Sequence, residues 1–340
     1  MNTLRRQAGL SLVELMVSVT LGLIVLSGVL MVFANSSASR SEVERTTRQI
    51  ENGRYASELL SDDIRLAGFF GEFDPTTIAA PGALPADPCS VTVADWNTWI
   101  PVYVRGYDNA GFTSANCALT NLKSGTDVLV VRRTRTCTAN ATTCTPDVTA
   151  GTPYLQVSAC GSQATKYALD IQPSSGSGAF TMQTKTCSAG TLAAKREYYV
   201  HIYFIATDNG RGDNVPTLKR LEMVGNSGGA PTFSLVPLVE GIENLQLNYG
   251  VDTNNDGSPD EYVTDPASVA RWTSVMTVQF NILARNIETS PNFTDTKTYA
   301  LGKDSTGATQ TFGPFNDGYR RHVYSGLVRI MNPAGKRDLP

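Results

Sequence analysis

A long uncharged stretch near the N-terminus, interrupted by one carboxylate, constrains this chain more than any other feature. Residues 10–34 contain Glu14 as their single charged side chain, and residues 15–34 contain none. At a rise of about 1.5 Å per residue, a helix over residues 15–34 is long enough to cross a hydrocarbon layer of about 30 Å. The basic residues Arg5 and Arg6 precede it and favour a cytoplasmic N-terminus. The sequence therefore predicts a membrane-spanning helix at the start of the chain.

Glu14 distinguishes this segment from an ordinary secretory signal peptide, which has a shorter apolar core and a cleavage site with small residues. Residues 33–38 imitate such a site only loosely. A carboxylate at the start of a membrane helix is costly unless it has a partner or a function. Cleavage between Gly9 and Leu10 would make Glu14 the fifth residue and create a new α-amino group. In a bundle of such helices, the carboxylate of one subunit can pair with the amine of its neighbour.

The residues around this bond resemble the prepilin processing site of type IV pilins and type II secretion pseudopilins. In that family a Gly precedes a hydrophobic residue, often Phe, and a Glu follows; here these positions are Gly9, Leu10 and Glu14. The resemblance implies that the prepilin peptidase removes a leader at residues 1–9, that Leu10 is N-methylated, and that Glu14 acts in assembly. The alternative is an uncleaved signal anchor.

Helical spacing continues beyond residue 34. Charged side chains, including Asp62 and Asp63, occupy most faces, and Gly68 provides a C-terminal stop. The sequence predicts one helix over residues 10–67, with residues 10–34 in the membrane and an amphipathic second half. Its apolar face is expected to carry Val43, Thr47, Ile50, Gly53, Ser57, Leu60, Ile64 and Ala67.

From residue 70 onward the pattern indicates strands and turns, with no further helix. Alternating apolar and polar residues favour antiparallel sheets with one covered face. The predicted fold class is α+β: a long N-terminal helix followed by an antiparallel β domain with a disulfide-bearing insertion. Strands are expected at residues 99–105, 127–133, 154–158, 197–206, 217–223, 233–239, 242–249, 274–284 and 321–331.

Six cysteines lie within one segment of roughly a hundred residues: Cys89, Cys117, Cys137, Cys144, Cys160 and Cys187. None forms a CxxC pair, so zinc binding is poorly supported. An even number in a Gly/Ser/Thr-rich segment indicates up to three disulfides in an oxidising compartment, with free buried thiols as the alternative. Fifteen pairings are possible; sequential pairing is preferred because each bridge then closes a local loop. We divide the remaining chain into a cysteine-rich region at 68–195 and a β region at 196–340, which are free to share one sheet.

One polar loop has the oxygen spacing of a calcium-binding loop. Its ligand candidates are Asp252, Asn254, Asp256, Ser258 and Asp260, with Gly257 at the turn. Val263 stands where such loops carry a bidentate Glu. The alternative is an Asx-rich hairpin turn. A calcium titration of the melting temperature separates the two, and no other cofactor is required.

The charge and the absence of known motifs argue against several classes of function. The net charge of −3 becomes about −5 without Arg5 and Arg6, so the chain has no basic field for nucleic acid. His201 and His322 have no metal-ligand or carboxylate neighbours in sequence and are expected to be structural. No hydrolase, zincin, P-loop or dinucleotide-binding motif occurs, so the chain is not expected to be an enzyme.

Four short runs, at residues 63–71, 239–252, 282–285 and 319–325, resemble the PilW minor pilins. The resemblance implies a low-abundance subunit that primes type IV pilus assembly, with other minor pilins, the major pilin and the prepilin peptidase as partners. It also implies a single pass through the inner membrane, a periplasmic C-terminal domain and later residence in the surface pilus, near its tip. The alternatives are a tip adhesin, a minor pseudopilin of a type II secretion system, and a membrane-tethered enzyme.

Overall fold

The structure is a computed structural model that describes residues 11–139 and 148–337. Gly9, Leu10 and Cys144 lie outside the described residues. The chain divides into two compact units, residues 1–48 and residues 49–340. Each unit is described by itself below.

Helix α1, Leu12–Leu66, covers almost all of the helix predicted at residues 10–67. Its apolar N-terminal residues are exposed, and α1 is the one helix among the described residues that is long and apolar enough to cross a membrane. Two residues after its last turn, Gly68 adopts a φ of +69°. An added Cβ would lie 2.7 Å from Pro333, so both the conformation and the space favour glycine here.

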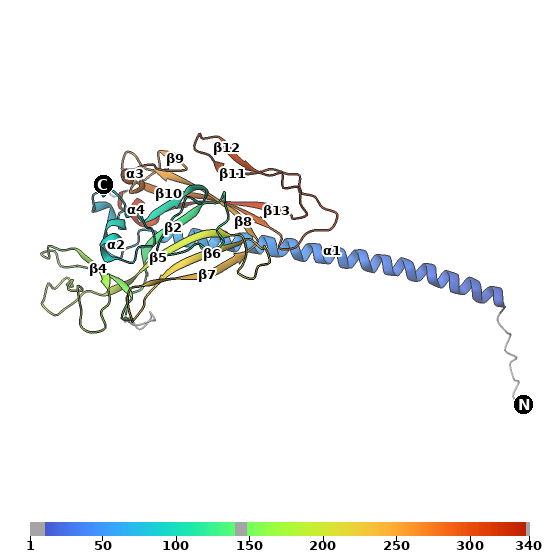
Figure 1. Ribbon diagram of the computed structural model, residues 1–340, viewed down its shortest axis with the longest axis horizontal. Coiled ribbons are helices and arrows are strands. Elements are labelled where there is room, and N and C mark those ends of the chain that lie inside the picture. The colour runs from blue at the N-terminus through green and yellow to red at the C-terminus, as the bar shows by residue number, and fades with distance from the viewer. Residues whose placement is uncertain (1–10, 140–147, 338–340) are drawn as a thin grey trace, which may run out of the picture. The chain divides into compact units, whose positions relative to one another are not determined.

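The larger sheet has seven strands, all paired antiparallel (Figure 1). The long strand β5 is its centre because it pairs with β2, β3 and β6. Strands from both sides of residue 195 belong to this sheet, so the cysteine-rich region and the C-terminal region share it. Its members are β1 Val104–Tyr107, β2 Val128–Thr134, β3 Pro153–Val157, β4 Tyr167–Ile171, β5 Lys195–Ala206, β6 Thr217–Val224 and β7 Thr232–Glu240.

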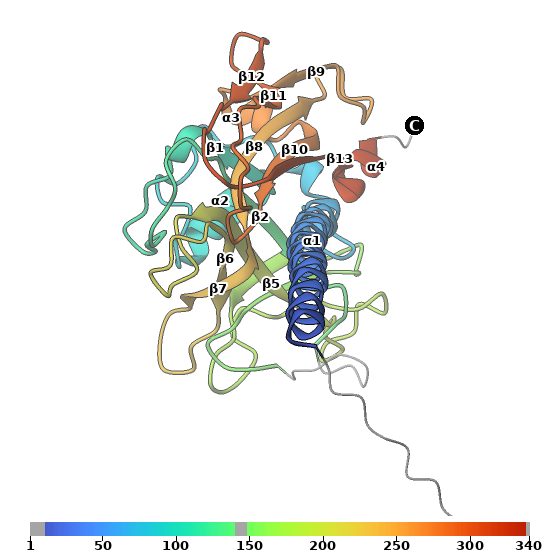
Figure 2. The same cartoon turned by 90° about the vertical axis from the view of Figure 1, so that its right-hand side faces the viewer.

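A second sheet has four strands in the order β13-β10-β8-β9, and Figure 2 shows β8, β10 and β13 side by side. Every residue of β8 is buried, as is typical of a strand that is covered on both faces. A separate two-stranded ribbon, β11 Tyr299–Lys303 and β12 Thr309–Phe312, lies in the connection before the last strand. The four strands are β8 Ile242–Val251, β9 Glu261–Val263, β10 Val275–Arg285 and β13 Arg321–Arg329.

The prediction of no helix after residue 70 is wrong. The missed helical elements are α2 Val93–Trp99, α3 Val269–Trp272, α4 Met331–Arg337 and the 3-10 helices η1 Pro75–Thr77 and η2 Asp108–Ala110. Strands β4, β9, β11 and β12 are also absent from the list of predicted strands.

Tertiary packing explains why a helix, α2, forms just before the strand expected at residues 99–105 and why that strand begins later than expected. Trp96 and Trp99 are both buried, and the indole N–H of Trp96 donates to the carbonyl of Ser90 at 2.7 Å. The guanidinium of Arg132 lies 3.9 Å from the ring centroid of Trp99. These contacts bring a tryptophan pair under the sheet, and β1 begins only at Val104.

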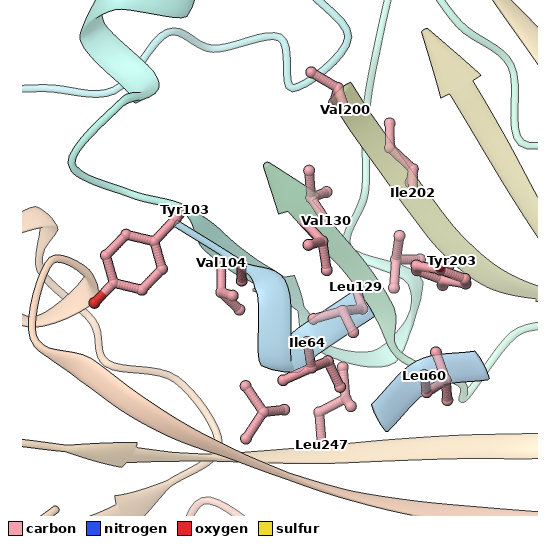
Figure 3. Close-up of a cluster of buried hydrophobic side chains, with 14 of the residues drawn as sticks. Leu60, Ile64, Tyr103, Val104, Leu129, Val130, Val200, Ile202, Tyr203 and Leu247 are labelled. Atoms are coloured by element: carbon pink, nitrogen blue, oxygen red, sulfur yellow. The ribbon is translucent and has the colours of Figure 1, made fainter. Parts of the chain in front are cut away.

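The core of the larger unit joins the end of α1 to both sheets. Figure 3 shows Leu60 and Ile64 of α1 directed toward Leu129 of β2 and Leu247 of β8. Leu60, Ile64 and Leu129 are completely buried, and Leu247 is nearly so. Burial of one such aliphatic side chain contributes about 1.5–3 kcal/mol to folding.

Disulfides join Cys89 to Cys117 and Cys160 to Cys187, as sequential pairing predicted. Cys137 is also disulfide-bonded. Its predicted partner, Cys144, lies outside the described residues. The pairing of these last two cysteines stays a prediction.

Arg321 is the centre of a buried ionic cluster that ties the β10–β13 connection to β8. Its Nε lies 2.5 Å from Glu243, and its two terminal nitrogens lie 2.9 Å from Asp295 and 2.6 Å from Asp317. The guanidinium also stacks 3.8 Å from the centroid of Phe315. Burial alone would raise the pKa of Glu243, but the hydrogen bond from Arg321 lowers it.

Candidate functional site

The first candidate site is the N-terminal part of α1. Glu14 lies in the first turn of the helix, and its side chain is exposed. The hydroxyl of Ser18 donates to the backbone carbonyl of Glu14 at 2.6 Å and makes no bond to its carboxylate. Apolar side chains of the following turns, such as Leu15 and Val25, are more than half exposed. This segment therefore presents a lipid-compatible surface with one carboxylate at its start.

The second candidate site is the part of α1 within the unit of residues 49–340. Its buried stripe differs from the predicted apolar face. Gly53, Leu60, Ile64 and Ala67 are buried as expected, but Ile50 is 44% exposed. The stripe also contains three residues that the prediction left out, Gln49, Ala56 and Asp63.

Gln49 is buried because its amide has two partners. Its Nε2 donates to the carbonyls of Ala284 at 2.9 Å and Arg320 at 3.0 Å. One turn further along, Gly53 accepts the ring of Tyr324 so closely that an added Cβ would lie 2.1 Å from a ring carbon. Because α1 lies this close to β13, residues of α1 are buried where the strand contacts them, whether or not their side chains are apolar.

Asp63 connects α1 to two strands of the larger sheet through polar contacts. Arg133 of β2 contacts Asp63 Oδ1 at 2.6 Å, while His201 Nδ1 and the Tyr203 hydroxyl of β5 contact Oδ2 at 2.7 and 2.8 Å. The Asp63 side chain is only 5% exposed. The Tyr203 hydroxyl in turn accepts a hydrogen bond from Arg220 at 3.1 Å. We call the five residues Asp63, Arg133, His201, Tyr203 and Arg220 the Asp63 cluster.

The charges and hydrogen bonds around Asp63 favour its ionised form in the folded protein. Burial would raise its pKa, but the charges and hydrogen bonds of His201 and Arg133 lower it well below its usual range. One expectation is thereby corrected, the assignment of Asp63 to a polar face of the helix. His201, which has no carboxylate constellation near it in sequence, pairs with the Asp63 carboxylate in the fold. The two residues are 138 positions apart, so no local pattern could have paired them.

The candidate calcium loop connects β8 to β9 in an antiparallel hairpin. Asp252 Oδ1 accepts from the Asn255 N–H at 2.6 Å, and Oδ2 accepts from the Gly257 N–H at 3.0 Å and from Arg337 at 2.9 Å. Asp260 Oδ2 accepts from the N–H and hydroxyl of Thr253, both at 2.7 Å.

The other candidate ligands make similar local bonds. Asn254 donates to Asp256 at 3.2 Å and to Asp260 at 3.1 Å, and Asp256 accepts from the Ser258 N–H at 2.8 Å. Within the described ranges, no group of three or more His, Cys, Asp or Glu side chains is placed to hold a metal ion. These contacts favour the Asx-turn alternative because they use the oxygens that a calcium ion would need. Calcium binding stays a hypothesis for the titration described above.

Comparisons with known proteins point to the same parts of the chain. Residues 202–332 match the family model "Type IV Pilus-assembly protein W", and residues 4–30 match "Prokaryotic N-terminal methylation motif". A comparison with curated proteins finds no match. Among solved structures, the chain is similar to a type IV-like pilin from Thermus thermophilus. The two share 15% identity over 61% of this chain and 78% of that chain, with a TM-score of 0.26, too low to bear on the fold.

The two family matches lie on opposite sides of the cysteine-bearing region, and the PilW match begins within β5. The match to the methylation motif covers the apolar segment that contains Glu14. The PilW match covers the end of β5 with Tyr203, all of β6 to β13, and the Arg321 cluster. The resemblance inferred from the sequence is confirmed at both ends of the chain: residues 4–30 match the N-terminal methylation motif of prepilins, and residues 202–332 match the PilW family model.

Proposed function

We propose that this chain primes or supports assembly of a type IV pilus and enters the pilus through its N-terminal helix. In this proposal the prepilin peptidase cleaves between Gly9 and Leu10, and Leu10 is then methylated. The observation that carries the proposal is the N-terminal part of α1, an exposed apolar helix with a carboxylate in its first turn. A surface of this kind is stable in lipid or against other apolar helices, whereas its apolar side chains would be unfavourably exposed in water.

Glu14 is the residue to which we assign subunit addition. Its carboxylate would pair with the α-amino group of a neighbouring subunit in an environment of low dielectric constant. Both charges are needed, because without the carboxylate the buried α-amino group would lose its hydration and gain no compensating interaction. We infer that the partners are other minor pilins and the major pilin, and that the role is structural rather than catalytic.

The proposed location follows from the same helix. Before assembly the chain would cross the inner membrane once, with residues 49–340 in the periplasm; the disulfides fit that oxidising compartment. After assembly it would lie in the surface pilus, near the tip.

Replacing Glu14 by glutamine is expected to block entry into the pilus without blocking membrane insertion. Breaking a buried ion pair costs about 3–5 kcal/mol, which corresponds to a decrease of about 100-fold or more in incorporation. The measurement is an immunoblot of sheared pili and of membranes from a deletion strain that expresses each variant. Ser18→Ala is the matched control, since Ser18 lies one turn away and bonds only to the helix backbone. Normal amounts of the Glu14→Gln variant in sheared pili would contradict the assigned role.

The same strains separate assembly from adhesion. Loss of pili in the deletion strain supports a role in assembly, while normal pili that no longer attach to surfaces support a tip adhesin. Removing about residues 80–190 is a poor test of the two roles. That deletion would take β1 to β4 out of the shared sheet and damage the fold itself.

A further inference from the structure

A groove within the unit of residues 49–340 lies outside the parts of the chain discussed above. It runs between strand β4, helix α2 and the 3-10 helix η1, and Figure 1 shows α2 and β4 close together. Its volume is about 620 Å³, within the range of pockets that bind ligands. We call it the β4 groove and define it by the residues 165–170 that form one wall, with Phe73, Ile78 and Val93 opposite.

The wall formed by β4 is an unpaired sheet edge. β4 is the last strand in the path β1-β2-β5-β3-β4, and its one partner is β3. The Ser158 N–H donates to the Lys166 carbonyl at 2.8 Å, and the Gln172 N–H donates to the Thr152 carbonyl at 2.9 Å. Even-numbered residues therefore direct their backbone groups toward β3, and odd-numbered residues direct theirs to the other side.

Two residues of β4, one partly exposed and one 3% exposed, thus direct their backbone groups away from β3 and toward the groove. These are the N–H and carbonyl groups of Tyr167 and Leu169, which have no hydrogen-bond partner among the residues that the structure describes. The edge ends at Ile171, whose N–H is occupied by the Asp170 carboxylate at 2.7 Å. Donors and acceptors in this arrangement are complementary to one added β-strand.

Side chains give the groove one apolar face. Tyr167 and Leu169 point to the same side of the sheet because they are two residues apart. The ring of Tyr167 packs against Phe73 with 4.6 Å between centroids, and Leu169 is buried. An added strand would therefore place apolar side chains beside Tyr167 and Leu169.

Charged side chains on the opposite face of β4 favour one orientation of an added strand. Lys166 and Asp170 stand near the two ends of the groove, with Ala168 between them. The Lys166 ammonium donates to the carbonyls of Gly161 and Gln163, which leaves one of its three donors for a ligand. Asp170 uses one carboxylate oxygen for the Ile171 N–H. An antiparallel strand would meet both charges favourably if a basic residue comes first and an acidic residue follows four positions later.

We propose that the β4 groove binds an extended segment of a partner protein, added antiparallel to β4. A basic residue of this segment lies opposite Asp170, an acidic residue lies opposite Lys166, and apolar residues lie beside Leu169 and Tyr167. This inference is independent of Glu14 and of the role in assembly, since it uses only the unit of residues 49–340.

The test uses the full chain in detergent micelles and a fluorescein-labelled peptide of sequence Thr-Arg-Val-Thr-Val-Glu-Thr. The peptide is expected to bind saturably and to slow amide hydrogen exchange at Tyr167 and Leu169. A peptide with Arg and Glu exchanged is expected to bind about tenfold more weakly, because two cross-strand charge pairs become repulsive. A version N-methylated at both valines is expected not to bind, since it cannot complete the ladder.

The double variant Lys166→Glu, Asp170→Lys is expected to reverse the preference between the two charged peptides. The matched control is Asp62→Lys, Arg65→Glu, which exchanges the charges of an exposed ion pair on α1 and should leave the preference unchanged. Circular dichroism of each variant shows that the fold is retained. Absence of binding by the wild-type chain, equal binding of the two peptides, equal binding of the N-methylated peptide, or unchanged exchange at Tyr167 and Leu169 would each overturn the proposal.

Discussion

Replacing Asp63 by alanine is expected to destabilise the unit of residues 49–340 by about 3–5 kcal/mol. The substitution leaves Arg133 and His201 buried beside α1 without their carboxylate, and it removes the acceptor of the Tyr203 hydroxyl. The cost comes from these groups left unpaired more than from the loss of attraction itself. Because Asp63 connects the last turns of α1 to β2 and β5 of the larger sheet, these turns should lose protection from amide exchange first.

The measurement is urea unfolding of the full chain in detergent, followed by fluorescence of the buried residues Trp96, Trp99 and Trp272. Asp62→Ala is the matched control: its carboxylate is 67% exposed and pairs only with the exposed Arg65, so a change within about 0.5 kcal/mol is expected. Equal stability of the Asp63→Ala and Asp62→Ala variants would show that the Asp63 cluster does not hold the helix in place.

The Asp63 cluster also predicts a pH dependence. Since the folded state lowers the pKa of Asp63, its stabilising effect is complete well above the unfolded value of about 3.9 and is lost as the pH falls below it. Asp63→Asn has no such titration. The difference in unfolding free energy between wild type and Asp63→Asn should therefore shrink progressively as the pH falls below about 4. A difference that grows in acid would contradict the assignment.

Replacing Arg321 by methionine is expected to cost a similar amount, about 3–5 kcal/mol, because buried Asp295 loses its cation and Glu243 loses the nearest of its cations, keeping Lys123 at 3.4 Å and Arg285 at 3.9 Å. Asp295 is fully buried and Glu243 is 6% exposed, so neither can recover its hydration without local unfolding. The connection between β10 and β13 should open, since Asp295 and Asp317 hold it to Arg321.

Arg321→Lys separates the effect of charge from the effect of shape. Lysine keeps the charge but lacks the planar fork that contacts three carboxylates, so a loss intermediate between wild type and Arg321→Met is expected in the same urea measurement. Arg211→Met is the matched control because Arg211 lies exposed in a turn. If Arg321→Lys is as stable as wild type, the fork geometry is unimportant and only the positive charge is needed.

The sequence predicts well those features that depend on local chemistry. The helix over residues 10–67 follows from its spacing and from Gly68, whose left-handed backbone ends it as expected. Strands such as β5 and β10 alternate apolar and polar residues, and they form within a residue or two of their predicted bounds. The two described disulfides follow the preference for local loops.

Features that depend on contacts distant in sequence were missed. α2 is a helix because Trp96 and Trp99 are buried under the sheet beside Arg132, which no local pattern shows. The buried stripe of α1 contains Gln49 and Asp63 because carbonyls and cations of distant strands satisfy them. A hydrophobicity pattern assigns such residues to the surface. Only the folded structure shows that their buried polar groups are satisfied by hydrogen bonds and ion pairs.

Mass spectrometry of the mature N-terminus, on protein taken from sheared pili, tests the central claim most directly. It reports cleavage, methylation and incorporation in one sample. The result that we expect is a chain that begins at N-methylated Leu10 and retains Glu14 as its fifth residue. A chain that keeps its first nine residues, that begins after residue 34, or that is found only in membranes would contradict assembly through a processed N-terminal helix.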